Sequence, residues 1–277
     1  MNDTMVLSPT KSTDRALRLG SVSYLNAKPL IYGLDDADGI DLRLDVPSRL
    51  LEGLRDSRFD VALLPVIDYQ HLDGLCLVPS GGIGCDGETL TVRIFSTKPV
   101  EQIRSIACDT DSHTSVALAR IIMAERYGLQ PRFLDLLRDD DSHCDAKLLI
   151  GDKVVCEEPV GFDHQVDLGA AWKELTGLPF VFAVWTARQG IDLGDLPQRL
   201  ANAKRHGLAH VREIITRYGI PRGWPEGLAL QYLTVYLKFD IGEPHLRAIR
   251  LFHQMAAKYG LAPTPPRELE MYLPPRG

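Results

Sequence analysis

The sequence has little of what marks a nucleic-acid-binding, exported or membrane protein. No cluster of Lys and Arg offsets a formal net charge of −6, so we expect no basic surface for nucleic acid. No apolar run is long enough to span a bilayer, and residues 1–16 hold no apolar core of signal-peptide length. We therefore expect a cytoplasmic protein with residues 1–16 as a disordered tail and with no membrane partner.

Sequence signatures of metal and nucleotide sites are also missing. The five cysteines form no CxxC pair, which fits reduced thiols, and Cys85 is interpreted as a small packed residue. His206 and His210 lie four apart on a predicted helix, but no HExxH motif or third ligand accompanies them. The run of aspartates in the loop 138–145 is interpreted as solvated. We expect no metal site.

What the sequence does contain is an alternation of strand and helix patterns. Residues 20–34 read as a strand, a turn and a helix, and 40–46 and 59–66 as strands on either side of a helix that begins at Pro47. This order indicates the start of a parallel sheet. A second unit has strands at 105–108 and 147–150 with a helix between them, and further helices are predicted at 197–218, 225–239 and 244–259. The apolar strand 180–186 is expected to be buried on both faces.

These patterns predict a two-lobed α/β protein in which each lobe is a mostly parallel sheet flanked by helices. Lobe 1 is expected to combine residues 17–93 with 186–277, and lobe 2 to comprise residues 94–185. Such a protein closes over a small ligand.

Several polar residues are placed where a ligand could bind. Ser23, Tyr24 and Asn26 follow the first strand, and ligands bind at the carboxyl ends of strands in an open α/β sheet. The alternative is an ordinary corner in which Asn26 caps the helix. Asp152 lies just after the strand 147–150, at its carboxyl end, and is a candidate catalytic carboxylate. The alternative is that it caps the segment that follows.

The start of the predicted helix at 112–127 is a candidate anion site. Ser112, Thr114 and Ser115 add hydroxyls to the free N–H groups of a helix N-terminus, which suits a carboxylate or a phosphate. The alternative is that Ser112 is only an N-cap. The glycine-rich segment 79–92 is either a plain turn or a place where backbone approaches a ligand, and it lacks the residue order of a phosphate loop.

Taken together, five motifs within residues 17–260 resemble the chorismate dehydratase family of the futalosine route to menaquinone: SVSYLNAKPLIYGL, GCDGETLTV, DSHTSVALAR, LLIGD and DLGAAWKELTGLPFVFAVW. The resemblance implies the fold of type II periplasmic binding proteins without export. It also implies a hydro-lyase that converts chorismate to 3-[(1-carboxyvinyl)oxy]benzoate with no metal or organic cofactor.

Site residues follow from the resemblance position by position. Asn26 matches the family's active-site asparagine, Thr91 stands where relatives have a serine, and His113 stands where an arginine is expected in an SRTS motif. With Asp152 as a possible base, the catalytic set is Asn26, Thr91 and Asp152. A carboxylate of the substrate is the other possible base. Substrate contacts are expected from a larger set: Ser23, Tyr24, Gly87, Ser112, His113, Thr114 and Ser115.

Two other functions fit the same patterns. One is a later enzyme of the same pathway with the same fold, and the other is a non-catalytic receptor for small carboxylates. The motif around Asn26 and the segment TGLPFVFAVW favour the dehydratase.

Overall fold

The computed structural model describes residues 15–109, 111–136, 144–156 and 160–274. Two predicted segments therefore fall largely outside the described residues. They are the disordered tail, up to residue 14, and the run of aspartates in the acidic loop.

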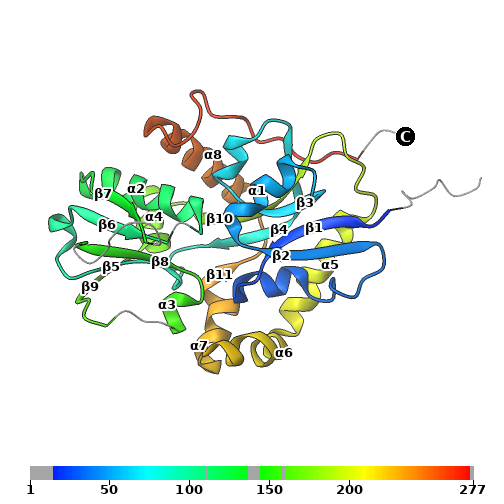
Figure 1. Cartoon of the computed structure of the whole chain (residues 1–277), viewed down its shortest axis with the longest axis horizontal. Coiled ribbons are helices and arrows are strands. Elements are labelled where there is room, and N and C mark those ends of the chain that lie inside the picture. The colour runs from blue at the N-terminus through cyan, green and yellow to red at the C-terminus, as the bar shows by residue number, and fades with distance from the viewer. Residues whose placement is uncertain (1–14, 110, 137–143, 157–159, 275–277) are drawn as a thin grey trace, which may run out of the picture.

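The chain forms two lobes side by side, each built on one β-sheet with helices around it (Figure 1). The first sheet has the strand order β11-β4-β10-β3-β1-β2 and the second the order β7-β6-β8-β5-β9. This confirms the predicted two-lobed α/β architecture. The strands of the first sheet are β1 (Leu17–Val22), β2 (Ile40–Asp45), β3 (Val61–Pro65), β4 (Leu75–Cys85), β10 (Phe180–Arg188) and β11 (Leu237–Lys238). Those of the second are β5 (Val92–Ser96), β6 (Ser105–Cys108), β7 (Arg132–Asp135), β8 (Ala146–Ile150) and β9 (His164–Asp167).

Both sheets are mixed, so the prediction of mostly parallel sheets is wrong on this point. In the first sheet β1 is parallel to β2 and β3, whereas β10 is antiparallel to β3 and β4, and β11 to β4. In the second sheet β6 is parallel to β7 and β8, whereas β5 is antiparallel to β8 and β9. The antiparallel pairs involve the strands next to the two places where the chain passes between lobes. The chain leaves the first sheet after β4 and enters the second at β5, and it returns to the first through β10. Strand–helix repeats predict parallel pairs but not these crossings.

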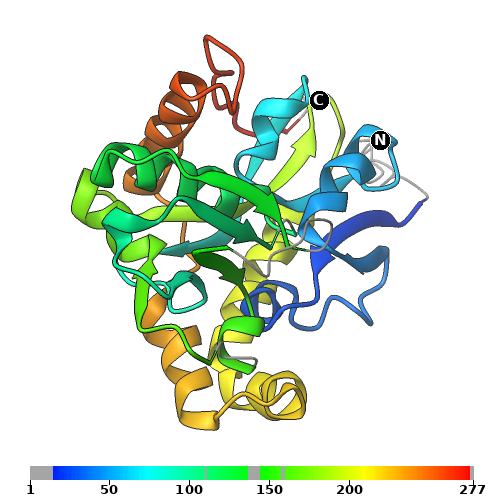
Figure 2. The same cartoon turned by 60° about the vertical axis from the view of Figure 1, so that its left-hand side comes forward.

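Helices cover both sheets. Helix α5 packs on β4 and on the short helix η1, α1 packs on β1 and β3, and α2 packs on β8 and on α4. In both views α8 lies at the opposite end of the molecule from α6 and α7 (Figures 1 and 2). The α-helices are α1 (Pro47–Arg55), α2 (His113–Tyr127), α3 (Lys153–Cys156), α4 (Leu168–Thr176), α5 (Leu196–Ala209), α6 (Val211–Ile214), α7 (Glu226–Gln231) and α8 (Glu243–Lys258). Short 3₁₀ helices are η1 (Leu25–Ile31), η2 (Asp68–His71), η3 (Val100–Gln102) and η5 (Ile220–Arg222), and π-helical turns are η4 (Ile215–Gly219) and η6 (Tyr232–Tyr236).

An aromatic cluster joins α4, β10 and α8. The rings of Trp172, Phe180 and Phe252 meet edge to face, with centroids 5.1–6.1 Å apart, and all three side chains are buried. Such contacts add to the free energy of burial. The strand β10 is buried at most positions, as its apolar sequence predicts, but Phe182 and Ala183 are half-buried. The expected lobe boundaries at 93/94 and 185/186 fall inside β5 and β10, and that division stays a prediction.

The glycine-rich segment is largely strand, and neither a plain turn nor a phosphate loop. Strand β4 runs through Gly81, Gly82 and Gly84 to Cys85. A Cβ on Gly82 would lie 2.4 Å from the carbonyl oxygen of Ala183, and one on Gly84 would lie 2.7 Å from that of Phe180. Both contacts are too short for any side chain, so glycine permits the close pairing of β4 and β10 where their register shifts.

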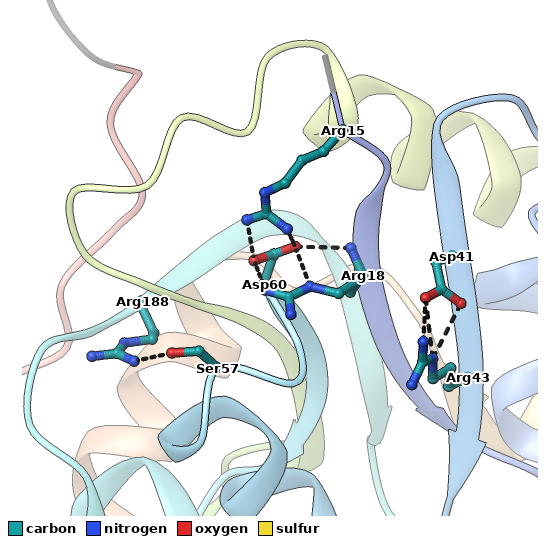
Figure 3. Close-up of polar contacts among 7 residues, drawn as sticks. All are labelled: Arg15, Arg18, Asp41, Arg43, Ser57, Asp60 and Arg188. Carbon is teal, nitrogen blue, oxygen red and sulfur yellow. Dashed lines mark hydrogen bonds and ion pairs between the residues drawn. The ribbon is translucent and has the colours of Figure 1, made fainter. Parts of the chain in front are cut away.

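A buried carboxylate fixes the start of the first sheet. Asp60 is 4% exposed and accepts hydrogen bonds from the guanidinium groups of Arg15 and Arg18 at 2.8–3.2 Å (Figure 3). Burial alone would raise the pKa of Asp60, but these bonds outweigh it and hold the pKa at about 2. The nearby pair Asp41–Arg43 is much more exposed.

Candidate active site

A cavity lies where the two lobes meet. Both sheets contribute, from β1, β3, β4 and β10 on one side and from β5, β8 and the start of α2 on the other. Every lining residue that the structure describes is apolar or neutral and polar. The polar members are Tyr24, Asn26, Thr89, Thr91, Ser112, Ser115 and Tyr232.

Asn26 points its amide into this cavity from η1, directly after β1. The 3₁₀ helix has Tyr24 at its N-cap and no side-chain cap bond, so Asn26 does not cap it. The oxygen Oδ1 of Asn26 is buried and has no hydrogen-bond partner among the described residues. A buried acceptor left unpaired costs about 1–3 kcal/mol, so a ligand that donates to it would recover this free energy.

Thr91 meets a residue that the sequence interpretation missed. Its Oγ1 lies 2.7 Å from the hydroxyl of Tyr232, and both side chains line the cavity. Tyr232 begins the π-helical turn η6, where a continuous helix over 225–239 was predicted. An aromatic residue on a predicted amphipathic helix is interpreted as part of the hydrophobic core, and no sequence motif marked Tyr232 as a site residue. Only the tertiary fold brings it to Thr91, 141 residues away in the chain.

The residues at the start of α2 fall into two groups, those that line the cavity and those that contact the first lobe. Ser112 caps the helix, since its Oγ accepts from the Ser115 N–H at 3.3 Å, and both serines line the cavity. The capping interpretation of Ser112 is confirmed, and an anion site at these serines stays a prediction. His113 and Thr114 point elsewhere: the Ile67 N–H donates to Thr114 Oγ1 at 3.3 Å across the lobes.

His113 contacts a buried aspartate instead of the cavity. Its Nδ1 lies 2.8 Å from Oδ1 of Asp68, whose side chain is 0% exposed. The hydrogen bond to Asp68 raises the pKa of His113, although burial opposes this shift. His113 and Thr114 thus hold the two lobes together behind the cavity.

Asp152 lies beside the cavity, in a second contact between lobes. Its Oδ1 accepts from the Leu25 N–H at 3.4 Å, and its Oδ2 lies 3.6 Å from Arg222. Burial raises the pKa of Asp152, and the hydrogen bond from Leu25 and the charge of Arg222 oppose that rise. The neighbouring Gly151 lines the cavity against the ring of Tyr24.

The remaining expected contacts lie outside the cavity wall. Ser23 is exposed, and its carbonyl oxygen accepts from Arg222 at 2.7 Å. Gly87 adopts φ +122° in the turn before β5, a conformation that favours glycine. Cys85 is buried away from the cavity, and burial raises its pKa to about 12, which fits a packed residue. No three His, Cys, Asp or Glu side chains of the described residues are grouped to hold a metal ion.

The menaquinone biosynthesis family matches residues 17–258, which span both lobes and the whole cavity wall. The chain belongs to this family. Within it, a chorismate dehydratase of Thermus thermophilus is 30% identical over 262 residues, covering 84% of this chain and 93% of the relative. A chorismate dehydratase of Campylobacter jejuni is 30% identical over 183 residues, covering 61% of this chain and 67% of the relative.

This menaquinone biosynthesis protein also shares its fold with binding proteins. A protein of Archaeoglobus fulgidus superposes with a TM-score of 0.70 at 16% identity, over 90% of this chain and 100% of the other. The periplasmic aliphatic sulphonate binding protein of Escherichia coli gives 0.62 at 13% identity, over 96% and 98%. The expected periplasmic-binding-protein-like fold is therefore confirmed. Among the described helices, none combines the length and apolarity needed to cross a bilayer.

Proposed function

We propose that this protein is a chorismate dehydratase, a hydro-lyase that converts chorismate to 3-[(1-carboxyvinyl)oxy]benzoate in the futalosine route to menaquinone. The relative of Thermus thermophilus, matched over 93% of its length, supports this assignment. One observation carries it further. The cavity combines one unpaired buried acceptor, Oδ1 of Asn26, and several neutral hydroxyls with the N-terminus of α2, which suits a small anion that also carries a hydroxyl group.

The reaction itself explains why such a cavity is sufficient. Chorismate loses a ring hydrogen and the neighbouring hydroxyl, and the product ring is aromatic, so elimination has a large driving force. The enzyme mainly has to orient the substrate and favour elimination over competing rearrangements. Preorganised polar groups achieve this without a strong acid in the wall.

In this proposal one carboxylate and the ring of chorismate have separate partners. The hydroxyls of Ser112 and Ser115 hold one carboxylate, and the N-terminus of α2 favours it through its partial positive charge. Asn26 and Thr91 orient the ring through hydrogen bonds.

Two groups are candidates for the general base that removes the ring hydrogen. Asp152 as the base stays a prediction, and its contacts with Leu25 and Arg222 fit a role in closing the lobes equally well. A substrate carboxylate is the other candidate. Asp152→Asn separates the two roles, since loss of the base lowers kcat whereas loss of closure mainly raises KM.

The deciding experiment is turnover of chorismate by the purified protein, with chromatographic separation of product from substrate. Formation of 3-[(1-carboxyvinyl)oxy]benzoate without added metal or nucleotide supports the proposal. Binding of chorismate without turnover would instead indicate a carboxylate receptor. Inertness toward chorismate combined with turnover of a later ring-bearing intermediate would indicate the other enzyme of the pathway.

A cytoplasmic location belongs to the same proposal. The sequence-based expectation of reduced thiols is compatible with it. Fractionation of cells that express the tagged protein tests it directly.

A further inference from the structure

Tyr232 occupies an unusual position for a core tyrosine. Its side chain is 1% exposed and its ring stacks on Trp224, with centroids 4.9 Å apart and an interplanar angle of 18°. Its hydroxyl nevertheless lines the cavity, 2.7 Å from Thr91 Oγ1. The residue begins a π-helical turn, a local irregularity that is frequent at functional sites.

A count of hydrogens shows that this pair can donate further. Thr91 and Tyr232 carry one hydroxyl hydrogen each, and the bond between them uses one. When the Thr91 hydroxyl donates to Tyr232, the phenolic hydrogen of Tyr232 is the one available to a ligand in the cavity. Asn26, which also interacts with the Tyr232 hydroxyl, leaves its Oδ1 unpaired nearby.

Tyr232 retains its proton at neutral pH. Burial raises the pKa of Tyr232, although the bonds to Thr91 and Asn26 oppose this, so the phenol stays protonated. Aliphatic hydroxyls such as those of Thr91 and Ser112 are much weaker acids. A leaving hydroxide is more basic than a phenolate, since bulk water has a pKa of about 15.7.

Tyr24 is the other phenol in the wall, and its surroundings differ. Its hydroxyl bonds to the carboxylate of Asp111, and Asp109 and Asp152 add negative charge nearby. Burial and these carboxylates together raise the pKa of Tyr24. A proton already shared with a carboxylate is not free for a neutral leaving group.

We propose that Tyr232 is the general acid that protonates the departing ring hydroxyl, an inference that rests on the proposed dehydratase function. The C–H bond at the carbon bearing the ether breaks, and its electron pair forms the new ring double bond. The neighbouring C–O bond breaks with its pair on oxygen, which takes the Tyr232 proton and leaves as water. The phenolate then regains a proton, through solvent, from the group that accepted the ring hydrogen.

The first test compares Tyr232→Phe with wild type and with Tyr236→Phe. Tyr236 lies on the same π-helical turn but outside the cavity wall, so it is the matched control. Tyr232→Phe keeps the ring on Trp224 and should lower kcat by about 10²–10⁴-fold, the usual contribution of a general acid. The affinity for product and the melting temperature should stay close to those of wild type, and Tyr236→Phe should match wild type.

A second test separates proton donation from simple packing. A chorismate analogue with chloride in place of the ring hydroxyl has a leaving group that needs no proton. Wild type and Tyr232→Phe should turn it over at similar rates. If Tyr232→Phe does not fold, wild type alone still decides, because a solvent deuterium isotope effect on kcat should be seen with chorismate and be absent with the chloride analogue.

The possible failures are distinguishable. A wild-type protein that leaves chorismate unchanged refutes the proposed function and this inference with it. An active wild type with an equally active Tyr232→Phe variant refutes only the inference, as does a variant equally impaired on both substrates.

Discussion

The described side chains that line the cavity are uncharged, whereas the contacts that hold the surrounding segments together include charged side chains. The described part of the cavity wall holds only apolar and neutral polar groups. The contacts around it depend on aspartates: Asp152 with Arg222, Asp68 with His113, and Asp60 with two arginines farther away. The difference teaches that charge here holds segments of chain together, while the proposed chemistry relies on neutral groups whose positions are fixed.

The largest effect is expected inside the cavity. Asn26→Ala should lower kcat for chorismate by about 10²–10³-fold, because one preorganised hydrogen-bonding group is lost. The melting temperature should change little, since Asn26 does not cap η1. Asn202→Ala on α5, whose amide bonds to Gln198, is the control and should keep full activity. Normal turnover by Asn26→Ala would place the chemistry elsewhere.

The next effect concerns stability alone. Asp60→Asn should lower the free energy of unfolding by about 2 kcal/mol near neutral pH, as expected for a carboxyl whose folded pKa is about 2. Because the folded pKa is depressed, this stabilisation is present above about pH 4 and is lost as pH falls toward 2. Denaturant unfolding at several pH values measures it.

The exposed neighbour in the same region provides the control for Asp60. Asp41→Asn removes the ion pair with Arg43 and should leave stability unchanged, because exposed pairs contribute little (Figure 3). Equal losses in the two variants would show that burial of Asp60 is not what matters.

A smaller effect should appear in substrate affinity. Arg222→Met removes the bonds to the Ser23 carbonyl and to Asp152 and should raise KM about tenfold with a smaller change in kcat, because the closed lobes become less populated. Arg212→Met, in an exposed pair with Glu226, is the matched control. A fall in kcat at constant KM would contradict a role in closure.

The smallest effect is the pH dependence of the contact behind the cavity. Asp68 raises the pKa of His113, so the pair stabilises the fold most below about pH 6.5 and loses this stabilisation as pH rises through the higher folded pKa. His113→Gln should cost less than about 1 kcal/mol at pH 6, because the partly exposed histidine is screened by solvent. A cost that is the same at pH 6 and pH 9 would contradict the assignment.

Sequence reasoning predicted the elements of α2 in detail and the sheets only in part. Ser112 at the N-cap is a local signal and is confirmed, and the helix ends at Tyr127 as predicted, with Gly128 in the left-handed conformation at φ 65°. The antiparallel strands and the long β4 were not predicted. Glycines within a strand are interpreted as a turn when the neighbouring strand that requires them is not known. Pairing between strands that are distant in the chain is not encoded in local periodicity.

The same limit applies to the candidate site. Tyr24, Asn26, Thr91, Ser112 and Ser115 line one cavity, and each follows a local motif. The partners that surround them come from distant segments, as Tyr232 does. On a predicted amphipathic helix, the sequence does not distinguish a tyrosine of the core from one that lines a cavity. The role of Tyr232 could therefore be inferred only after the fold was known.

The close pairing of β4 and β10 limits how this enzyme could acquire new substrates. Ile83 on β4 and Phe182 and Ala183 on β10 line the cavity, yet Gly82 and Gly84 beside them admit no side chain. A side chain at either glycine would separate the strands and displace Ile83, Phe182 and Ala183, so the shape of this part of the wall depends on the two glycines. A directed-evolution library aimed at altered specificity should leave the two glycines fixed and vary Pro47, Thr89 and Leu237, which line the cavity from outside the β4–β10 pair.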